Sequence, residues 1–426
     1  MLTLGSTRTI EACIVCGSND LKPFLDLGST PLANRFLTRE ELEMPEPAYP
    51  LRVAYCTDCS HVQLSEVVPP RDMFEDYLYV SSASDTLRGH LFDLSAIMSD
   101  RRGLTTDDLV VDIGCNDGAL LEGFQRFGVR TLGVDPAKNL ADLARDTGIE
   151  RYVDLFDSRS ADEIVDRWGR AALIMATNTF PHIPDLHDFM EGIEKALQPG
   201  GAFVIEAHYL LDMIEQGAFD TIYHEHVSYW SLGPLMRLLE QHGFQVVDAE
   251  RVPLHHGQLR VTMQRNGERD PDARVEQILA VERERGLGRK QTFEAFAERT
   301  ANVKRVLSRM LEDRRSAGVR VVGYGAPAKG NTLLSYLEIG PDKIGYIVDR
   351  SPLKQGRFTP GSHIPIVPVE RLLKDQPDAV VLFAWNFVDE IVQQQVEYRR
   401  RGGRFIVPIP TPFELTHEDI EAVSAR

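Results

Sequence analysis

The sequence has no long apolar run. A helix that crosses a bilayer needs roughly 18 or more apolar residues, and no stretch comes near that length. The first residues, MLTLGSTRTIEACIVC, also lack the basic region followed by roughly 7–15 apolar residues that marks a secretory signal. Both absences predict a cytoplasmic protein without a membrane partner.

Basic residues are in the minority. Lysine and arginine total 47 against 64 acids, which gives a formal charge of −17, and no long basic run is present. Such a charge repels a phosphate backbone, so we expect no nucleic-acid partner, although a local basic pocket could hold one small phosphate ester. With 43% hydrophobic and 26% charged residues, the 426-residue chain has a globular composition and the length of roughly two to four domains.

Cysteine is scarce, and its spacing is therefore informative. The five cysteines are Cys13, Cys16, Cys56, Cys59 and Cys115, so four of them form two Cys-x-x-Cys pairs. In a reducing compartment this pattern favours a tetrahedral zinc site over disulfides, with a redox pair as the alternative. Four thiolates would leave no position for a water ligand, so we expect the zinc to be structural.

From residue 108 the pattern changes to strand, turn and helix. Apolar residues predict a buried strand at 109–113, a glycine turn at 114–118, a helix at 119–127 and a second strand at 131–136. Gly114 and Gly118 permit positive φ and a close approach of the backbone to a ligand at the helix N-terminus. This order predicts nucleotide binding at the carboxyl edge of a doubly wound parallel sheet.

The spacing of the glycine loop distinguishes two cofactors. A dinucleotide loop reads G-x-G-x-x-G, whereas this loop reads D-x-G-x-x-x-G from Asp112. It resembles motif I of the class I methyltransferases that use S-adenosylmethionine (SAM), and LQPGG at 197–201 resembles a later turn of that fold. The resemblance implies that Asp135 binds the ribose. The implied cofactor contacts are Asp112, Gly114, Asn116, Gly118, Asp135, Pro136, Asp157 and Asn178.

A dense set of proton-handling side chains follows at Tyr223, His224, Glu225 and His226. Two histidines around a glutamate, next to a tyrosine, exceed what packing requires, so we interpret this YHEH run as catalytic. His224 is expected to face away from His226 on an extended segment and to be structural. His182 lies in a turn, where capping is the alternative to a place in the pocket.

Over most of its length the chain resembles the deoxysugar C-methyltransferases of antibiotic and polysaccharide biosynthesis. The likeness rests on the four-cysteine module, the Tyr77 and Tyr79 segment, the SAM loop, NTFPH at 178–182, YHEHVSY at 223–229 and GYGAPAKG at 323–330. It implies a nucleotide diphosphate 4-keto-6-deoxysugar as substrate, usually thymidine-linked. It also implies methylation at the ring carbon next to the ketone, with C3 favoured.

A carbon next to a ketone becomes nucleophilic only after it loses a proton, which requires a base of near-neutral pKa and donors for the enolate oxygen. We expect His226 to be the base, oriented by Glu225 or another group. The candidate donors are Tyr223, Tyr77, Tyr79 and His182, although the two alternating tyrosines could equally form a packed hinge. An O- or N-methyltransferase would need less of this apparatus, and a SAM-sensing binding protein would need the YHEH run to be structural.

A second α/β unit starts near residue 319. A strand at 319–325, a helix at 329–337 and a strand at 344–349 flank a glycine turn that lacks the third glycine of a dinucleotide site. Because the implied substrate carries a diphosphate, we assign this unit to sugar-nucleotide binding. The candidate contacts are Tyr324, Lys329, Asn331, Arg350, Lys354 and His363, with ordinary surface cations as the alternative.

These patterns predict an α/β protein in three parts. Residues 1–75 form a zinc-binding module, 76–270 a class I SAM methyltransferase domain, and 271–426 a helical bracket followed by a Rossmann-like domain. The bracket covers 273–317, where charges surround apolar positions at helical spacing. We expect a monomer whose partner is a nucleotide-linked ketosugar.

Overall fold

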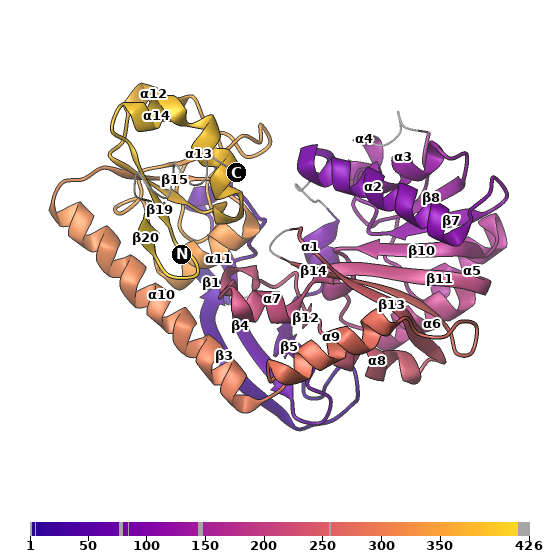
Figure 1. The fold of residues 1–426 in the computed structure, drawn as a ribbon. Helices are drawn as coiled ribbons and strands as arrows, with labels where there is room; N and C mark the ends of the chain where they lie inside the picture. Colours follow the sequence, from indigo (N-terminus) through magenta and orange to yellow (C-terminus); the bar gives the residue numbers. More distant parts are fainter. Residues whose placement is uncertain are drawn as a thin grey trace.

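Among the described residues, three β-sheets and a two-stranded ribbon form the framework of the protein. The computed structural model describes all residues except 1, 5, 76–79, 84, 144–147, 255–256 and 416–426. Figure 1 shows the N-terminal sheet at the base of two α/β lobes, which we call the central and the C-terminal lobe. No helix among the described residues combines the length and the apolar character needed to cross a membrane.

The N-terminal sheet joins strands that lie far apart in the sequence. Its order is β1-β4-β5-β12, and β3 pairs with β4. The strands are β1 (Leu2–Leu4), β3 (Leu21–Thr30), β4 (Glu46–Cys56), β5 (Val62–Leu64) and β12 (Ser228–Tyr229); the ribbon pairs β2 (Arg8–Thr9) with β6 (Glu66–Val67), and helix α1 (Pro70–Phe74) follows. Strand β12 comes from the middle of the chain and runs antiparallel to β5. The N-terminal sheet therefore holds the residues that follow the YHEH run.

The central lobe is a seven-stranded sheet in the order β13-β14-β11-β10-β7-β8-β9. Its strands are β7 (Leu109–Ile113), β8 (Arg130–Val134), β9 (Glu150–Tyr152), β10 (Ala171–Thr177), β11 (Leu197–His208), β13 (Phe244–Val252) and β14 (Gln258–Arg265). The five from β7 to β11 are parallel, and β13 and β14 form an antiparallel edge. This is the doubly wound sheet that the sequence predicts, with β7 on the expected residues 109–113.

Helices cover both faces of the central sheet (Figure 1). They are α2 (Asp85–Arg102), α3 (Ala119–Gln125), α4 (Lys138–Leu143), α5 (Ser158–Trp168), α6 (Leu186–Ala196), α7 (Leu210–Glu215) and α8 (Leu232–Glu240). Neighbouring strand residues enter different cores: Val110 packs with α2 and α3, whereas Val111 packs with α5, α6 and α8. Burial on both faces explains why β7 is apolar throughout.

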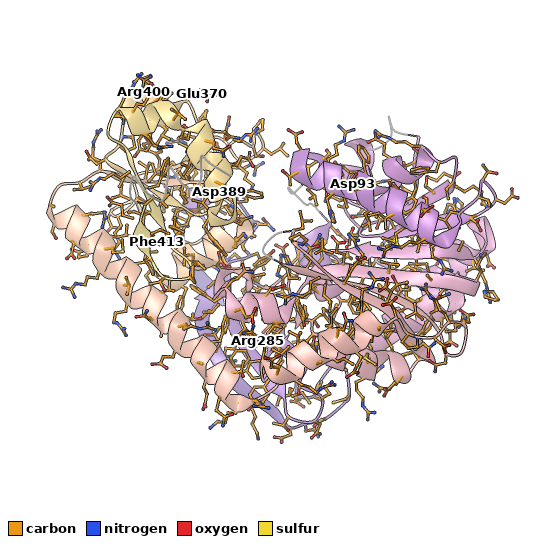
Figure 2. All side chains as sticks on the ribbon, in the orientation of Figure 1. Asp93, Arg285, Glu370, Asp389, Arg400 and Phe413 are labelled. Atoms are coloured by element: carbon orange, nitrogen blue, oxygen red, sulfur yellow. The ribbon has the colours of Figure 1, made fainter. Side chains whose placement is uncertain are left out.

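The C-terminal lobe repeats this architecture with six strands in the order β17-β16-β15-β18-β19-β20. The strands are β15 (Val321–Tyr324), β16 (Ile347–Val348), β17 (Ile366–Val367), β18 (Ala379–Leu382), β19 (Arg404–Val407) and β20 (Phe413–Glu414); the helices are α11 (Ala328–Tyr336), α12 (Arg371–Asp375), α13 (Val388–Gln394) and α14 (Val396–Arg400). All strands except β20 are parallel. Figure 2 shows the exposed Glu370 and Arg400 at the outer end of this lobe. The structure thus confirms a second α/β unit.

Two helices bridge the lobes, as the charged helical pattern predicts. Helix α9 (Ala273–Glu284) contacts β13, and the long helix α10 (Lys290–Ser316) contacts both β3 and β15. On α10, Phe293 stacks on Tyr55 of β4 with 4.6 Å between ring centroids. Apolar residues of the N-terminal sheet, α10 and the C-terminal sheet form one continuous core. These regions are therefore joined by packing and not by a flexible linker.

Candidate active site and zinc site

A cavity of about 570 Å³, here called the central cavity, opens at the carboxyl ends of β7, β8 and β10. Its lining includes Asn34 from the N-terminal region and the loops that follow these three strands. The C-terminal lobe adds Lys329, Lys354 and Asn386. Doubly wound sheets bind ligands at this edge, where the helix N-termini also converge. All three regions of the chain therefore contribute to one candidate binding site.

The loop after β7 reaches the central cavity through a glycine at which any side chain would be strained. Gly114 has φ +73°, and a Cβ there would lie 2.1 Å from Oγ1 of Thr179. The next turn is fixed by the carboxylate of Asp135, which accepts hydrogen bonds from the backbone N–H groups of Asn116 and Ala137, each at 2.9 Å. The loop and the acid at the end of β8 are thus held as one unit.

His226 is buried and points into the central cavity. Its Nδ1–H donates to the carbonyl oxygen of Thr221 at 2.7 Å, because a carbonyl accepts only from a protonated ring nitrogen. The neutral ring therefore carries its lone pair on Nε2. Burial and, to a smaller extent, the charge of Lys329 lower the pKa of His226 to about 4, although the Thr221 carbonyl opposes this effect. The imidazole is consequently neutral at pH 7.

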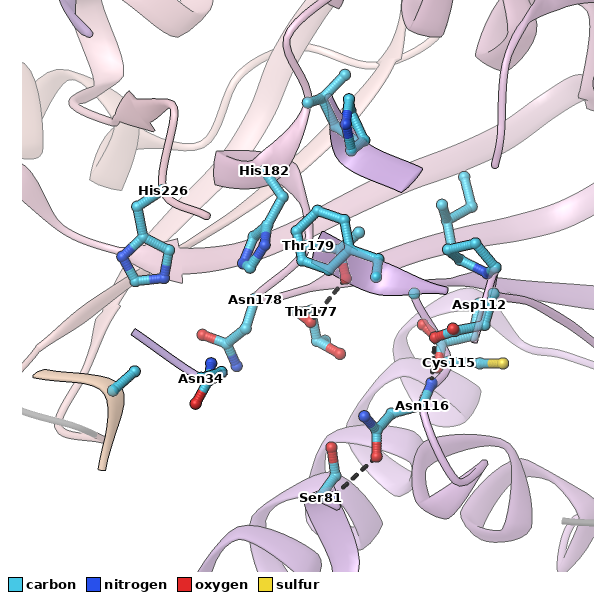
Figure 3. Close-up of a pocket in the computed structure, with 18 of the residues that line it drawn as sticks. Asn34, Ser81, Asp112, Cys115, Asn116, Thr177, Asn178, Thr179, His182 and His226 are labelled. Atoms are coloured by element: carbon cyan, nitrogen blue, oxygen red, sulfur yellow. Dashed lines mark hydrogen bonds between the residues drawn. The ribbon is translucent and has the colours of Figure 1, made fainter. Parts of the chain in front are cut away.

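Three rings surround His226. Tyr223 lies over it with 4.0 Å between ring centroids, and the centroids of His182 and His208 lie at 5.1 and 5.3 Å. Burial and the neighbouring His226 hold the pKa of His182 well below its usual range, so this ring is also neutral. Figure 3 shows His226 and His182 side by side at one end of the cavity and Asp112 at the other. Sequence reasoning had not singled out His208.

The YHEH run is a turn and not the extended segment that we expected. The backbone N–H of His226 donates to the carbonyl of Tyr223 at 2.9 Å. On an extended strand, His224 and His226 would face the same side, because side chains alternate with period two. The turn instead sends Nε2 of His224 to the carbonyls of Tyr49 and Pro50, 3.2 Å from each. His224 is thus a structural contact with the N-terminal sheet.

Glu225 is oriented by a residue from the N-terminal region. The side-chain amide of Asn34 donates to both carboxylate oxygens, at 2.8 and 3.0 Å. Asn331 of α11 donates in turn to the carbonyl of Ala33 at 2.7 Å. The Thr221 carbonyl, and not Glu225, holds Nδ1 of His226. No local signal links Asn34 to Glu225, since 191 positions separate them in the sequence.

Two of the predicted substrate contacts line the central cavity. Lys329 lies in the first turn of α11, and Lys354 follows β16. The ammonium of Lys354 donates to the carbonyl of Ala326 at 2.8 Å. Of the other predicted site residues, Tyr77 and Tyr79 lie outside the described residues.

The other four predicted substrate contacts lie outside the cavity lining, and each has a polar contact to another protein group. Asn331 contacts Ala33, and His363 lies 2.9 Å from the buried carboxylate of Glu46. Arg350 is exposed and pairs with Glu390 at 3.2 Å. Tyr324 is buried, with its hydroxyl 3.5 Å from Nε2 of Gln395. Their contacts are structural, and two of them fasten the C-terminal lobe to the N-terminal region.

The four paired cysteines converge at the tip of the N-terminal sheet. All four sulfurs lie within 4.8 Å of one another, with Cys13 and Cys59 at 3.5 Å and Cys16 and Cys56 at 3.6 Å. Cys115 lies elsewhere, in the lining of the central cavity.

Comparison with known proteins finds three successive matches along the chain. Family models match residues 13–74 ("Putative zinc binding domain"), 89–249 ("Methyltransferase domain") and 253–410 ("C-methyltransferase C-terminal domain"). C-methyltransferase NovU from Streptomyces niveus is 40% identical over 413 residues, which cover 96% of this chain and 98% of NovU. The chain belongs to the SAM-dependent C-methyltransferase family.

More distant relatives match only part of the chain. A ubiquinone biosynthesis O-methyltransferase from Methylobacterium sp. is 26% identical over 162 residues, which cover 34% of this chain and 63% of that protein. A solved SAM-dependent methyltransferase from Clostridium acetobutylicum aligns with 42% of this chain and 91% of its own, at 15% identity and a TM-score of 0.34. The likeness to NovU, in contrast, extends through the cysteine cluster and the C-terminal lobe.

The central cavity of this C-methyltransferase fits SAM chemically. Asp112 is buried at the end of β7, and its Oδ1 has no hydrogen-bond partner among the described residues. Burial and the charge of Asp135 raise the pKa of Asp112 well above its usual range. Burial and the charge of Asp135 both disfavour the ionised carboxylate, and a cationic ligand offsets both effects. SAM carries two cationic groups, a sulfonium and an ammonium. Asp112 and Asp135 are thus the residues that we expect to hold it.

The remaining predicted cofactor contacts divide into two groups. Asn116, Pro136, Asp157 and Asn178 line the central cavity. Asp157 also caps α5 by accepting from the N–H of Ser160 at 2.6 Å. Gly118 lies outside the lining and begins α3 with φ +89°. Its role in the loop is conformational.

The cysteine cluster fits a tetrahedral zinc ion. Zn–S bonds of about 2.3 Å place tetrahedral sulfurs about 3.8 Å apart, close to the observed separations of 3.5 and 3.6 Å. The zinc of this enzyme is structural, since four thiolates complete its coordination and the cluster lies outside the central cavity.

Cys56→Ser should therefore lose zinc. Structural zinc contributes folding free energy directly, so the midpoint of thermal unfolding should fall as well. Elemental analysis and calorimetry measure both effects. Cys115→Ser is the matched control and should retain its zinc, whereas stoichiometric zinc in purified Cys56→Ser would contradict the four-cysteine site.

Asp135→Ala should weaken SAM binding about ten- to hundredfold, which corresponds to about 1.5–3 kcal/mol for a lost hydrogen bond to a charged group. Isothermal titration calorimetry gives the affinity, and Asp166→Ala, an exposed substitution on α5, controls for the loss of an acid. Equal SAM affinities in the two variants would remove Asp135 from the cofactor site.

Proposed function

We propose that this C-methyltransferase acts on a nucleotide diphosphate 4-keto-6-deoxysugar, thymidine-linked, and methylates C3 next to the ketone. We further propose that His226 generates the carbon nucleophile. The observation that carries this proposal is the neutral His226 ring, with Nε2 free of the Thr221 hydrogen bond, in the same cavity as the SAM loop. In this proposal the enzyme is a cytoplasmic monomer of three parts, divided at residues 75 and 270.

The chemistry of the carbon nucleophile supports a base at this position. A C–H bond next to a ketone must lose its proton before the carbon can accept a methyl group. Nε2 of His226 takes that proton, and Thr221 stabilises the resulting imidazolium through Nδ1–H. SAM, when bound, supplies a methyl group on a positively charged sulfur. In this proposal the cavity walls hold the substrate carbon in line with the methyl carbon and the sulfur of SAM. This positioning supplies a large part of the acceleration.

The distribution of charge in the cavity supports an anionic group at its C-terminal side. Among the described residues, the acids of the lining all belong to the central lobe, whereas the C-terminal lobe contributes two lysines, Lys329 and Lys354, and no acid. Lys354 and the first turn of α11, where Pro327 and Ala328 also line the cavity, are the proposed contacts to the diphosphate. The sugar then extends from the C-terminal lobe toward His226.

The enolate oxygen requires hydrogen-bond donors. Tyr223, which lies over His226, and the neutral His182 are the proposed donors among the described residues. Tyr77 and Tyr79 belong to the same proposed set. Glu225, oriented by Asn34, is proposed to position this group of polar side chains.

His226→Asn should retain SAM and sugar-nucleotide binding, because neither ground-state complex requires a base. Turnover and solvent-deuterium exchange at the substrate carbon should both fall by about 10²–10⁴, the usual contribution of a positioned general base. Mass spectrometry with a panel of 4-ketosugar nucleotides follows both quantities. His242→Asn, which lies outside the cavity lining, serves as the control. Persistent wild-type exchange in His226→Asn would assign the base to another residue, and wild-type methylation without any exchange would indicate an oxygen or nitrogen nucleophile.

The pH profile should show a base with a lowered pKa. A base stays active as long as it is neutral, so a pKa of about 4 preserves activity well below pH 6.5. We predict that kcat/KM changes less than twofold between pH 7 and 5.5. A histidine with an ordinary pKa of about 6.5 would lose nearly tenfold over this range. A tenfold loss with the protein still folded would contradict the assignment.

A further inference from the structure

Lys329 reaches into the central cavity on the side where His226 lies. It is partly buried in the first turn of α11, and both Lys329 and His226 line this cavity. Its ammonium nitrogen lies 5.2 Å from the ring centroid of Trp385. Among the described residues, no hydrogen bond or ion pair within 4.0 Å involves this nitrogen, so its N–H groups are available to a ligand.

A buried carboxylate holds Trp385, the ring that this lysine approaches. Asp220 is fully buried, and its Oδ2 accepts from Nε1 of Trp385 at 2.7 Å. Burial lowers the pKa of Lys329, and the charge of Asp220 opposes this effect. Burial raises the pKa of Asp220 to about 6, and the Lys329 ammonium limits that increase. Asp220 also directly precedes Thr221, the residue that orients His226. One short segment therefore positions both the lysine and the histidine.

The positive charge of Lys329 and the negative charge of Asp220 cancel. This neutrality decides whether a diphosphate or a ketone is the better ligand for Lys329. A diphosphate brings two negative charges, which require an excess of positive charge that Asp220 removes. A ketone is uncharged in the ground state and becomes negative only when its neighbouring carbon is deprotonated. The Lys329 ammonium, whose charge Asp220 favours, suits the ketone. Its hydrogen bond to the ketone oxygen can strengthen in the transition state, when that oxygen becomes negative.

We infer that Lys329 donates to the enolate oxygen of the substrate and that Asp220 and Trp385 position it for this role. The inference rests on the proposed function. In the step, the C–H bond breaks and an N–H bond forms at Nε2 of His226. The C–H electron pair becomes the C=C bond, and the C=O π pair moves onto oxygen. Lys329 keeps its proton and donates a hydrogen bond to that oxygen.

The first test separates a ketone contact from a phosphate contact. Lys329→Met should bind SAM and thymidine diphosphate within threefold of wild type, because neither probe contains the ketone. Deuterium exchange at the substrate carbon should fall about 10²–10³-fold, the usual loss for one oxyanion donor. Lys374→Met, an exposed change on α12, is the matched control. Calorimetry and mass spectrometry supply the measurements.

Three outcomes would overturn the inference. Tenfold weaker binding of thymidine diphosphate to Lys329→Met, with wild-type exchange at saturation, would make Lys329 a phosphate contact. Equal exchange rates in Lys329→Met and wild type would remove it from the reaction. Borohydride trapping of the ketosugar on Lys329 would show covalent chemistry. If the wild-type enzyme exchanges no ketosugar nucleotide, the proposed function fails as well, and this result is distinct from the other three.

A second variant tests the positioning role and remains informative if Lys329→Met does not fold. Asp220→Asn removes the charge that favours the ammonium, so the pKa of Lys329 should fall. As the pH rises, turnover of the variant should therefore begin to fall at a lower pH than turnover of the wild type. Lowering the pH again should restore it. A uniform loss of turnover at every pH would indicate a merely structural role for Asp220 and would contradict the positioning claim.

Discussion

The pairing of β12 with β5 is the constraint on which the candidate active site depends. Strand β12 leaves the central lobe and completes the N-terminal sheet, and the N–H of Leu64 donates to the carbonyl of Val227 at 2.9 Å. The turn before it carries Tyr223, Glu225 and His226. Because strand pairing fixes the register of this turn, the N-terminal sheet positions Tyr223 and His226 in the lining of the central cavity. The zinc cluster belongs to the same N-terminal region and lies outside that cavity.

Burial sets the protonation states of this site. It keeps His226 neutral, raises the pKa of Asp112 and lowers that of Lys329, with Asp220 opposing the last effect. A neutral base beside a retained cation suits a reaction in which a proton leaves carbon and negative charge develops on oxygen. The likeness to NovU over nearly the whole chain supports carbon as the nucleophile, whereas the O-methyltransferase from Methylobacterium sp. matches only 34% of the chain.

Local patterns in the sequence predict the parts of this structure that depend on neighbouring residues. The strand at 109–113, its glycine loop and the two Cys-x-x-Cys pairs all lie where short spacings place them. Contacts between distant segments carry no such signal. Asn34 contacts Glu225, and Glu46 contacts His363, only because the N-terminal region packs against both lobes. The same packing explains why several polar residues after β15 and β16 face other protein groups and not the cavity.

The protonation of His226 is the quantity that tests this account most directly. Nitrogen NMR of the enzyme with ¹⁵N-labelled histidine, assigned with His226→Asn, reports which ring nitrogen carries hydrogen as the pH changes. We predict a neutral ring at pH 7, protonated at Nδ1 and unprotonated at Nε2, with a midpoint near pH 4. A ring that is protonated at both nitrogens at pH 7, or a neutral ring with its hydrogen on Nε2, would contradict the account.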